Sequence, residues 1–236
     1  MEDTQPDNKA SVAAMFNSIA HSYDFLNHFL SFGMDKLWRR RAIRIISETY
    51  NNPKILDVAT GTADLSIAAL KAEPAGVTGI DISDRMLEIG RNKIARKGVS
   101  DRIRLIRGDS ENLPFEDNAF DVAMVAFGVR NFSDPMKGLS EMRRVVKDGG
   151  MVLVLEFSRP LSFPFRQIYK FYFLRILPLM GRLFSGNKSA YRYLPESVMH
   201  FPDNEEFMNL MTKAGLVAVK QKKLTSGVAS IYTGVK

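Results

Sequence analysis

The residues from Ile55 to Leu65 have the pattern of a nucleotide-binding turn. An apolar strand breaks at Gly61 into a glycine turn, and the residues beyond the turn open a helix. About 20 residues after Gly61, a second apolar strand ends in Asp81, whose carboxylate can accept hydrogen bonds from both hydroxyls of a ribose. The turn alone is also compatible with an ordinary strand-to-helix connection. Together with Asp81 it favours a site for an adenosine-containing ligand.

The turn lacks the glycine pattern that binds the phosphates of a dinucleotide, and this narrows the choice of ligand. A dinucleotide fingerprint has the pattern G-x-G-x-x-G with the pyrophosphate at the helix N-terminus, whereas here Asp57 would repel a pyrophosphate. S-adenosylmethionine carries no phosphate, but it carries an ammonium, a carboxylate and a sulfonium group. Asp57 and Asp64 suit its cationic groups, and the turn amides and Thr62 suit its polar parts. The residues therefore predict S-adenosyl-L-methionine as the cofactor.

The composition excludes several classes of site. The chain has 236 residues and no cysteine, so disulfides, thiolate metal sites and a cysteine nucleophile are all excluded. Its three histidines, His21, His28 and His200, are too widely spaced to predict a metal site. The acidic, polar start at residues 1–8 is the opposite of a secretory signal, which has a basic end and an apolar stretch. We therefore expect a cytoplasmic protein without a metal ion.

The formal net charge of +7 raises the question of an anionic partner. A basic protein favours nucleic acid or an anionic membrane surface, and charge alone does not choose between them. The cations recur in clusters on segments whose alternate positions are mostly apolar, so most of them are better explained as solvated faces of amphipathic elements. These clusters lie at residues 36–44, 91–97, 102–107 and 220–223.

Apolar runs alternate with helical periodicity from Lys54 to Phe157, which predicts βαβ units and a parallel sheet. Ser83 and Asp134 are expected helix N-caps, and residues 147–150 are expected to stop the helix that Asp134 begins. With a C-terminal hairpin, the fold class is a doubly wound α/β sheet of seven strands, mostly parallel, with an antiparallel last strand. Right-handed crossovers place the carboxyl ends of the parallel strands at one edge, where ligands bind. We expect strands near 54–59, 76–81, 103–108, 120–127 and 151–157, helices at 63–72, 83–97 and 134–146, and the hairpin at 216–224 and 228–235.

Two segments lie outside this pattern, within what we expect to be a single domain spanning residues 1–236. In the N-terminal helical segment, residues 1–50, apolar side chains recur at spacings of three or four and form a helix face. The second segment, residues 160–201, follows the fifth strand, where a doubly wound enzyme can carry a substrate cap. We expect both segments to carry specificity. The apolar face consists of Val12, Phe16, Ile19, Tyr23 and Leu26.

Within the second segment, residues 163–184 are dense in aromatic side chains interrupted by single cations. Arg166, Lys170, Arg175 and Pro178 exclude a membrane-spanning helix, which needs about 20 mostly apolar residues. A helix at the membrane interface, or one lining an apolar pocket, fits the composition. Packing on the sheet fits equally well, because aromatic stripes at helical spacing are usually core. The same stretch could also bury against a second subunit, so the sequence leaves the oligomeric state open.

Several further strings resemble a known family. They are residues 16–24, 108–115 and 155–158, the string Phe-Gly-Val-Arg-Asn at 127–131, and Ser-Ala-Tyr-Arg-Tyr-Leu-Pro-Glu-Ser at 189–197. On these strings the chain resembles the ubiquinone/menaquinone biosynthesis C-methyltransferases, among them the demethylmenaquinone methyltransferases, over nearly its full length. The strand-turn pattern at Gly61 is shared by all class I methyltransferases, whereas the strings at 127–131 and 191–194 are much narrower.

The resemblance implies roles for five residues in cofactor binding. Gly61 and Thr62 meet the methionine end, Asp81 holds the ribose, and Asp109 with Ser110 brackets the adenine. The chemistry agrees, because a carboxylate accepts from the exocyclic amine of adenine while a backbone amide donates to a ring nitrogen. The chain departs from the family pattern at three positions, which are Ala63 in place of a glycine, Ala126 in place of a serine and Asp148 in place of a proline.

The reaction that the resemblance implies is transfer of the sulfonium methyl group to a ring carbon of a reduced, prenylated naphthoquinol, which converts demethylmenaquinol to menaquinol. We expect Arg130 to stabilise the developing naphtholate and Asn131 to orient the ring. The alternative for Arg130 is a structural ion pair with Asp134 or another carboxylate. An arginine is not a general base at ordinary pH, and the sequence does not choose among water, His200 and Tyr193 for that role.

A polyprenyl tail places this substrate in a bilayer, so the implied partners are a prenylated quinol and, transiently, an anionic membrane surface. We expect reversible, peripheral association with the inner face of the membrane, to which each nearby Lys or Arg contributes about 1 kcal/mol.

Three rival functions differ in what they require of the chain. Methylation of a benzoquinol or a lipid would use the same cofactor residues. RNA methylation agrees with the charge, but no stacked-aromatic RNA signature is present, and we expect no nucleic-acid partner. A non-catalytic quinone carrier would retain only the shape of the pocket, and the intact Thr62, Asp81 and Asp109 argue against it.

Overall fold

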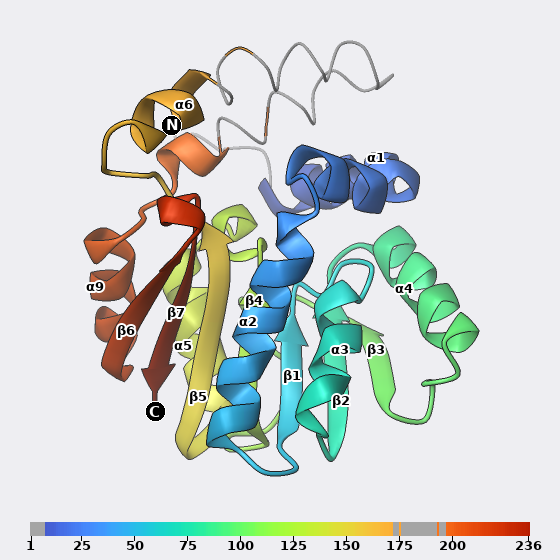
Figure 1. Ribbon diagram of the computed structural model, residues 1–236. Helices are drawn as coiled ribbons and strands as arrows, with labels where there is room; N and C mark the ends of the chain where they lie inside the picture. Colours follow the sequence, from blue (N-terminus) through green and yellow to red (C-terminus); the bar gives the residue numbers. More distant parts are fainter. Residues whose placement is uncertain (1–7, 172–174, 176–192, 194–196) are drawn as a thin grey trace, which may run out of the picture.

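The computed structural model describes residues 8–171, 175, 193 and 197–236, which form a seven-stranded sheet with helices on both faces (Figure 1). The strands are β1 (Lys54–Val58), β2 (Gly76–Asp81), β3 (Ile103–Arg107), β4 (Phe120–Ala126), β5 (Val146–Phe157), β6 (Val217–Leu224) and β7 (Ala229–Val235). Their order is β3-β2-β1-β4-β5-β7-β6. Strands β1 to β5 are parallel, and β7 is antiparallel to both of its neighbours. The predicted fold class and antiparallel last strand are confirmed.

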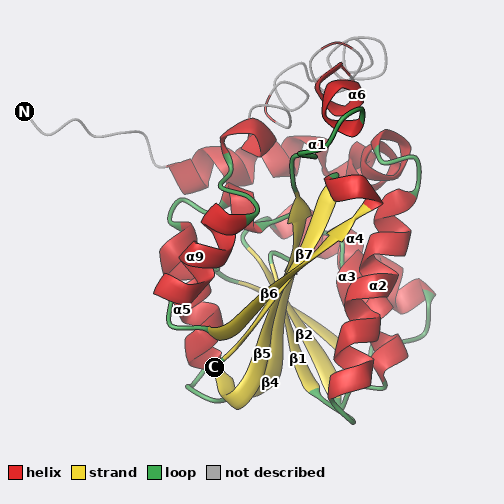
Figure 2. Ribbon diagram, turned by 60° about the vertical axis from the view of Figure 1, so that its left-hand side comes forward, coloured by secondary structure: helices red, strands yellow, loops and turns green. Residues whose placement is uncertain are grey.

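The helices form two layers and a cover. They are α1 (Asn8–Leu30), α2 (Met34–Thr49), α3 (Asp64–Ala69), α4 (Asp84–Arg96), α5 (Pro135–Val145), α6 (Phe165–Phe171) and α9 (Glu205–Lys213), with single 3₁₀ turns η1 (Leu70–Ala72), η2 (Val129–Asn131) and η4 (Thr225–Gly227). Helices α2, α3 and α4 lie on one face of the sheet and α5 and α9 on the other (Figure 2). Helices α1 and α6 lie at the edge where the parallel strands end (Figure 1).

The strands are buried on both faces, which explains their nearly continuous apolar sequences. In β1, Ile55 packs with the residues of α2 and α3, and the next residue, Leu56, packs with those of α5 and α9. Both side chains are 0% exposed. Each face of the sheet therefore has its own apolar core, and the sheet is held rigidly between them.

The predicted helix starts are confirmed in two places. Ser83 Oγ accepts a hydrogen bond from the Met86 amide (3.2 Å) and caps α4, and Asp134 Oδ1 accepts from the Lys137 amide (3.0 Å) and caps α5. Helix α5 ends at Val145, just before residues 147–150, so the predicted stop is confirmed, but β5 begins directly at Val146 rather than near residue 151. The glycines there extend the strand, since Gly149 N donates to Lys236 O (3.2 Å) and Gly150 O accepts from Lys236 N (3.0 Å).

The two segments outside the sheet are described in part. The first contains helices α1 and α2, with Val12 buried and Phe16 and Ile19 half-buried, whereas the predicted face positions Tyr23 and Leu26 have no described side chains. In the second, the string at 189–197 is described only at Tyr193 and Ser197, and its other residues lie outside the described part. No helix among the described residues is both long and apolar enough to cross a bilayer.

Candidate functional site

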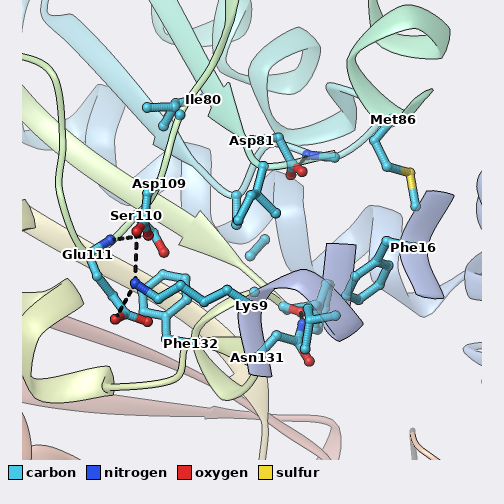
Figure 3. Close-up of a pocket in the computed structure, with 18 residues that line it drawn as sticks. Lys9, Phe16, Ile80, Asp81, Met86, Asp109, Ser110, Glu111, Asn131 and Phe132 are labelled. Atoms are coloured by element: carbon cyan, nitrogen blue, oxygen red, sulfur yellow. Dashed lines mark hydrogen bonds and ion pairs between the residues drawn. The ribbon is translucent and has the colours of Figure 1, made fainter. Parts of the chain in front are cut away.

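A cavity of about 690 Å³, part of it open to solvent, lies at the carboxyl edge of the sheet (Figure 3). Its walls come from the loops after β1, β2, β3 and β4 and from the N-terminal half of α1. Among its wall residues are five of the predicted site residues, namely Gly61, Asp81, Asp109, Ser110 and Asn131.

The turn after β1 is organised around the buried carboxylate of Asp57. Its Oδ2 accepts hydrogen bonds from the hydroxyls of Thr60 and Ser66, both at 2.6 Å. Its Oδ1 is buried and has no hydrogen-bond partner among the described residues. Burial raises the pKa of Asp57 to about 6, although the two hydroxyls act in the opposite direction. Gly61 adopts a φ of 55°, the left-handed conformation that glycine favours, and so turns the chain back toward β2.

Asp81 joins the turn after β1 to the loop after β2. Its Oδ2 accepts from the Gly61 amide (2.8 Å) and its Oδ1 from the Ser83 amide (2.9 Å). These bonds fix the carboxylate at the cavity wall and leave lone pairs for a ligand, because each carboxylate oxygen accepts more than one hydrogen bond. Burial raises the pKa of Asp81 above its ordinary value, and the backbone amides offset part of that shift.

Asp109, at the end of β3, lies on the opposite wall and is paired with Lys9 of α1. Lys9 Nζ lies 2.7 Å from Asp109 Oδ2 and 2.8 Å from Glu111 Oε2, so the lysine reaches across the cavity (Figure 3). Burial raises the pKa of Asp109, but hydrogen bonds from Lys9 and from the Glu111 amide outweigh it and hold the pKa below its ordinary value. Ser110, next in the chain, lines the same wall.

Thr62 is 2% exposed and lies in a second, smaller cavity rather than in the larger one. Its hydroxyl donates to Asp24 Oδ1 of α1 (2.5 Å) and accepts from Lys93 Nζ (2.9 Å). The smaller cavity also has Asp57 and Arg39 in its walls, and Gly61 belongs to both cavities. The turn after β1 therefore connects a charged recess to the main cavity.

Helix α1 contacts all three loops that carry the predicted cofactor residues. Lys9 pairs with Asp109 after β3, Asn17 Oδ1 accepts from the Ser83 hydroxyl after β2 (2.7 Å), and Asp24 accepts from Thr62 after β1. Sequence reasoning missed these three residues. Their spacings of eight and seven place them on one face of a helix, which is the signal that could have found them.

We expect the substitution Lys9→Ala to loosen the N-terminal half of α1. The Lys9–Asp109 ion pair is partly exposed, so its loss should weaken the packing of the N-terminal half of α1 against the loops by about 1 kcal/mol. Hydrogen exchange of the α1 amides should then rise about fivefold. Exchange measured by mass spectrometry at low salt checks this. Lys213→Ala, which removes an exposed lysine from α9, is the control. Unchanged exchange in the Lys9 variant would show that the pair does not hold α1 down.

Arg130 follows β4 in η2 and is not a wall residue of either described cavity. Its NH1 donates to Glu156 Oε1 of β5 (2.8 Å) and to Phe127 O (2.5 Å). The ion pair that sequence analysis gave as the alternative is thus present, with Glu156 as the carboxylate rather than Asp134. The Nε of Arg130 is buried without a hydrogen-bond partner among the described residues, so one donor remains unused.

Asn131 connects the larger cavity to Tyr193. Its side chain lies in the cavity wall, and its Oδ1 accepts from the Tyr193 hydroxyl (3.0 Å). Burial raises the pKa of Tyr193, so this hydroxyl is protonated at neutral pH and acts as a donor. His200, another residue considered as a base, has an exposed side chain.

The residues at this edge fit S-adenosyl-L-methionine. The unpartnered, buried Oδ1 of Asp57 offers negative charge to the cationic methionine end, whereas Asp64 is already paired with Lys93 at 2.6 Å. Asp81 offers two acceptor oxygens to a ribose, and Asp109 offers an acceptor to an adenine amine. Ala63, where a glycine is usual, keeps the left-handed φ of 67°, so the turn retains its course despite the side chain.

Comparison with known proteins agrees with this geometry. The model of the ubiE/COQ5 methyltransferase family matches residues 3–236. A ubiquinone/menaquinone biosynthesis C-methyltransferase of Geotalea daltonii is 46% identical over 95% of this chain and 96% of its own. A demethylmenaquinone methyltransferase of Porphyromonas gingivalis is 44% identical over 99% of this chain and 96% of its own, and one of Bacteroides fragilis is 43% identical over 95% and 92%.

Solved structures agree on the fold. The crystal structure of a SAM-dependent methyltransferase of Thermotoga maritima superposes with a TM-score of 0.67 at 20% identity and covers 95% of this chain and 99% of its own. The chain belongs to the ubiE/COQ5 methyltransferase family and is a C-methyltransferase that uses S-adenosyl-L-methionine.

Proposed function

We propose that this enzyme methylates a ring carbon of a reduced, prenylated naphthoquinol and converts demethylmenaquinol to menaquinol. The names of the relatives from Porphyromonas gingivalis and Bacteroides fragilis support this acceptor. The observation that carries the proposal is the turn after β4. It presents Asn131 to the cavity and keeps the buried Arg130 Nε without a partner. A phenolate oxygen is a ligand that an unused guanidinium donor and an amide can both serve.

In this proposal four residues bind the cofactor, and Arg130 stabilises charge on the acceptor. S-adenosyl-L-methionine supplies the electrophilic methyl group when it is bound. Asp81 and Asp109 hold its adenosine, and Thr62 and Gly61 lie at its methionine end. Arg130 stabilises negative charge on the acceptor oxygen as the neighbouring ring carbon becomes nucleophilic. Much of the acceleration comes from holding the two reactants in line in a dry site, which is worth roughly 7–11 kcal/mol in well-oriented reactions.

In this proposal the acceptor hydroxyl loses its proton to water, and the ring carbon forms its new bond as the bond from the methyl group to the sulfonium breaks. The hydrogen on that ring carbon then leaves as a proton and returns to the oxygen, which restores the hydroxyl and the aromatic ring. Tyr193 is protonated and already donates to Asn131, which makes it a poor base. Tyr193 instead orients the Asn131 amide, whose Nδ2 then faces Phe127 O at 3.4 Å. His200 is exposed to water, so we do not give it the role of base.

The experiment that tests the acceptor is a transfer assay with methyl-labelled S-adenosyl-L-methionine and chemically reduced demethylmenaquinone in detergent. We expect label in the quinol product and none with the oxidised quinone, because only the quinol has an electron-rich carbon. A reduced demethylated benzoquinone is the second acceptor in the same assay. Transfer to the benzoquinol alone would replace the naphthoquinol as substrate, and no transfer despite cofactor binding would move the acceptor to another class.

We also propose that residues 1–236 form one methyltransferase domain, in which residues 1–50 cover the cofactor and residues 160–201 form the cap over the acceptor. The enzyme would work in the cytoplasm at the inner face of the membrane. Helix α6 lies at the end of the sheet that holds the cavity (Figure 1). Large apolar side chains in α6 and just before it are exposed, and they include Phe163 (80% exposed), Leu161 (64%) and Phe171 (61%). The exposed cations Arg166 and Arg175 accompany them.

This surface predicts a reversible attachment to anionic vesicles. We expect the double substitution Phe163→Ser and Phe171→Ser to lower vesicle binding about tenfold, because each removes an exposed aromatic side chain that could enter the interface. Co-sedimentation with phosphatidylglycerol-containing liposomes measures it. Val217→Ser removes a 60% exposed apolar side chain at the start of β6, the opposite end of the sheet, and is the control. Binding that is unchanged in the double variant, or unaffected by added salt in the parent, would contradict the proposed surface.

A further inference from the structure

The carboxylate of Glu156 holds both the backbone and the side chain of Arg130. Glu156 is 0% exposed near the end of β5, and its Oε1 accepts from Arg130 NH1 (2.8 Å) and from the Phe157 amide (2.9 Å). Its Oε2 faces the Arg130 amide at 3.5 Å. Arg130 NH1 also donates to the Phe127 carbonyl, and the ring of Phe157 lies over the guanidinium, with its centroid 5.5 Å from Cζ.

This arrangement comes from the register of two neighbouring strands. Strands β4 and β5 are parallel, and Ala126 of β4 lies opposite Leu155 of β5. The turn η2 that follows β4 and Glu156 near the end of β5 therefore come together at the carboxyl edge. Phe127 adopts a left-handed φ of 57°, a conformation that costs a bulky residue strain. Its carbonyl is thereby directed at Arg130, which fixes the turn on which both Arg130 and Asn131 stand.

An isolated buried carboxylate is unfavourable, and Glu156 sits where it neutralises one specific arginine. The Arg130 side chain is 6% exposed, so the two charges are shielded from water together. Glu156 and Phe127 hold NH1, and the ring of Phe157 lies beside the guanidinium, so its movement is restricted, while Nε has no partner among the described residues. A fixed donor of this kind is the geometry that charge stabilisation in a reaction requires.

We propose that Glu156 is a positioning residue for methyl transfer, which holds the Arg130 guanidinium in the one orientation that serves the acceptor oxygen and sets the net charge beside that oxygen. The inference rests on the proposed role of Arg130. Glu156 does not touch the substrate or the cofactor, and its effect passes through Arg130.

Other charged groups around the pair are few among the described residues. Tyr169 of α6 and Tyr193 face it from the second segment and Tyr232 from β7, and burial raises the pKa of all three tyrosines, so they are neutral at ordinary pH. Asp203 and Arg159 lie beside Tyr169 and pair with each other at 2.7 Å. The charge next to the acceptor oxygen is therefore set mainly by Arg130 and Glu156.

Two substitutions separate the effect of the Glu156 charge from the effect of its side-chain length. Glu156→Asp keeps the charge and shortens the side chain by one methylene, and we expect kcat to fall roughly 10- to 100-fold with the acid limb of the pH profile unmoved. Glu156→Gln keeps the length and removes the charge, which leaves the Arg130 cation uncompensated. The acceptor hydroxyl should then ionise more easily, and the acid limb should move to lower pH by about one unit.

Two further measurements make the outcome unambiguous. Affinity for S-adenosylhomocysteine, measured by calorimetry, should stay within about twofold of the parent, since neither variant touches the cofactor residues. In an Arg130→Met background, Glu156→Gln should change kcat by less than about twofold, because residues that act as a unit are not additive. If Glu156→Gln binds no S-adenosylhomocysteine and so is not folded, Glu156→Asp alone decides.

Some results would overturn the inference. Equal losses of kcat and of S-adenosylhomocysteine affinity would show a purely structural role, and an undiminished effect of Glu156→Gln in the Arg130→Met background would show that Glu156 acts elsewhere. If Arg130→Met itself leaves kcat unchanged, the proposed role of Arg130 fails and the inference fails with it. A fall with Arg130→Met but not with either Glu156 variant overturns the inference alone.

Discussion

Replacing Arg130 with methionine is expected to lower kcat for methyl transfer by about 10²- to 10³-fold, the loss typical of removing one charge-stabilising donor. This corresponds to about 2.7–4 kcal/mol of transition-state stabilisation. The reason is that the guanidinium, buried together with Glu156, keeps an Nε donor without a partner among the described residues, which the proposal assigns to the acceptor oxygen. Methionine keeps much of the side-chain volume and removes all donors. Single-turnover assays with labelled cofactor and the quinol acceptor measure the loss.

The control for this prediction is Arg143→Met. Arg143 lies on α5, away from the cavity, and donates to Gly215 O at 2.9 Å, so its loss should leave kcat within about twofold. Affinity for S-adenosylhomocysteine should be unchanged in both variants. An Arg130 variant with full kcat and lower thermal stability would mean that the pair with Glu156 serves the fold alone.

The sequence predicted the sheet and the cofactor loops because both depend on local signals. Apolar runs in β1 and β2, a left-handed Gly61 and a carboxylate at the end of β2 are all readable from residue type and spacing. The side chains of Asp81, Asp109 and Ser110 meet at one cavity because the carboxyl ends of parallel strands share an edge.

The partners of these residues were beyond the reach of sequence reasoning, because they come from distant parts of the chain. Glu156 stands in an apolar string and reads as a buried strand residue, and only the register of β4 with β5 brings it to Arg130. Lys9 belongs to the polar start of the chain, where nothing nearby indicates that it reaches Asp109, 100 positions away. The early start of β5 at Val146 was missed for the same reason, since Lys236 at the far end of the chain pairs with Gly149 and Gly150.

Replacing Asp81 with asparagine is expected to weaken cofactor binding by roughly 10- to 100-fold, since a hydrogen bond to a charged group is worth about 1.5–3 kcal/mol. The amide keeps one acceptor oxygen, so one of the two ribose hydroxyls loses its carboxylate partner. The Asp81 carboxylate also accepts from the Gly61 and Ser83 amides, and the amide group of asparagine can satisfy only one of them without repelling the other. Calorimetric titration with S-adenosylhomocysteine measures the affinity. Asp84→Asn, at an exposed carboxylate three residues on, is the matched control and should bind as the parent does.

The same titration repeated across pH separates a role in binding from a role in folding. Burial raises the pKa of Asp81, so in the parent the carboxylate is protonated at a higher pH than an ordinary aspartate, and cofactor affinity should fall as the pH drops through that raised value. The bound cofactor favours the ionised form, so the affinity is fully present above the raised pKa and is lost below it. The asparagine variant has no such proton to gain and should show no fall from this group. If the variant instead keeps the parent's affinity and pH profile, the ribose is held elsewhere, and Asp81 serves only to tie the turn after β1 to the loop after β2.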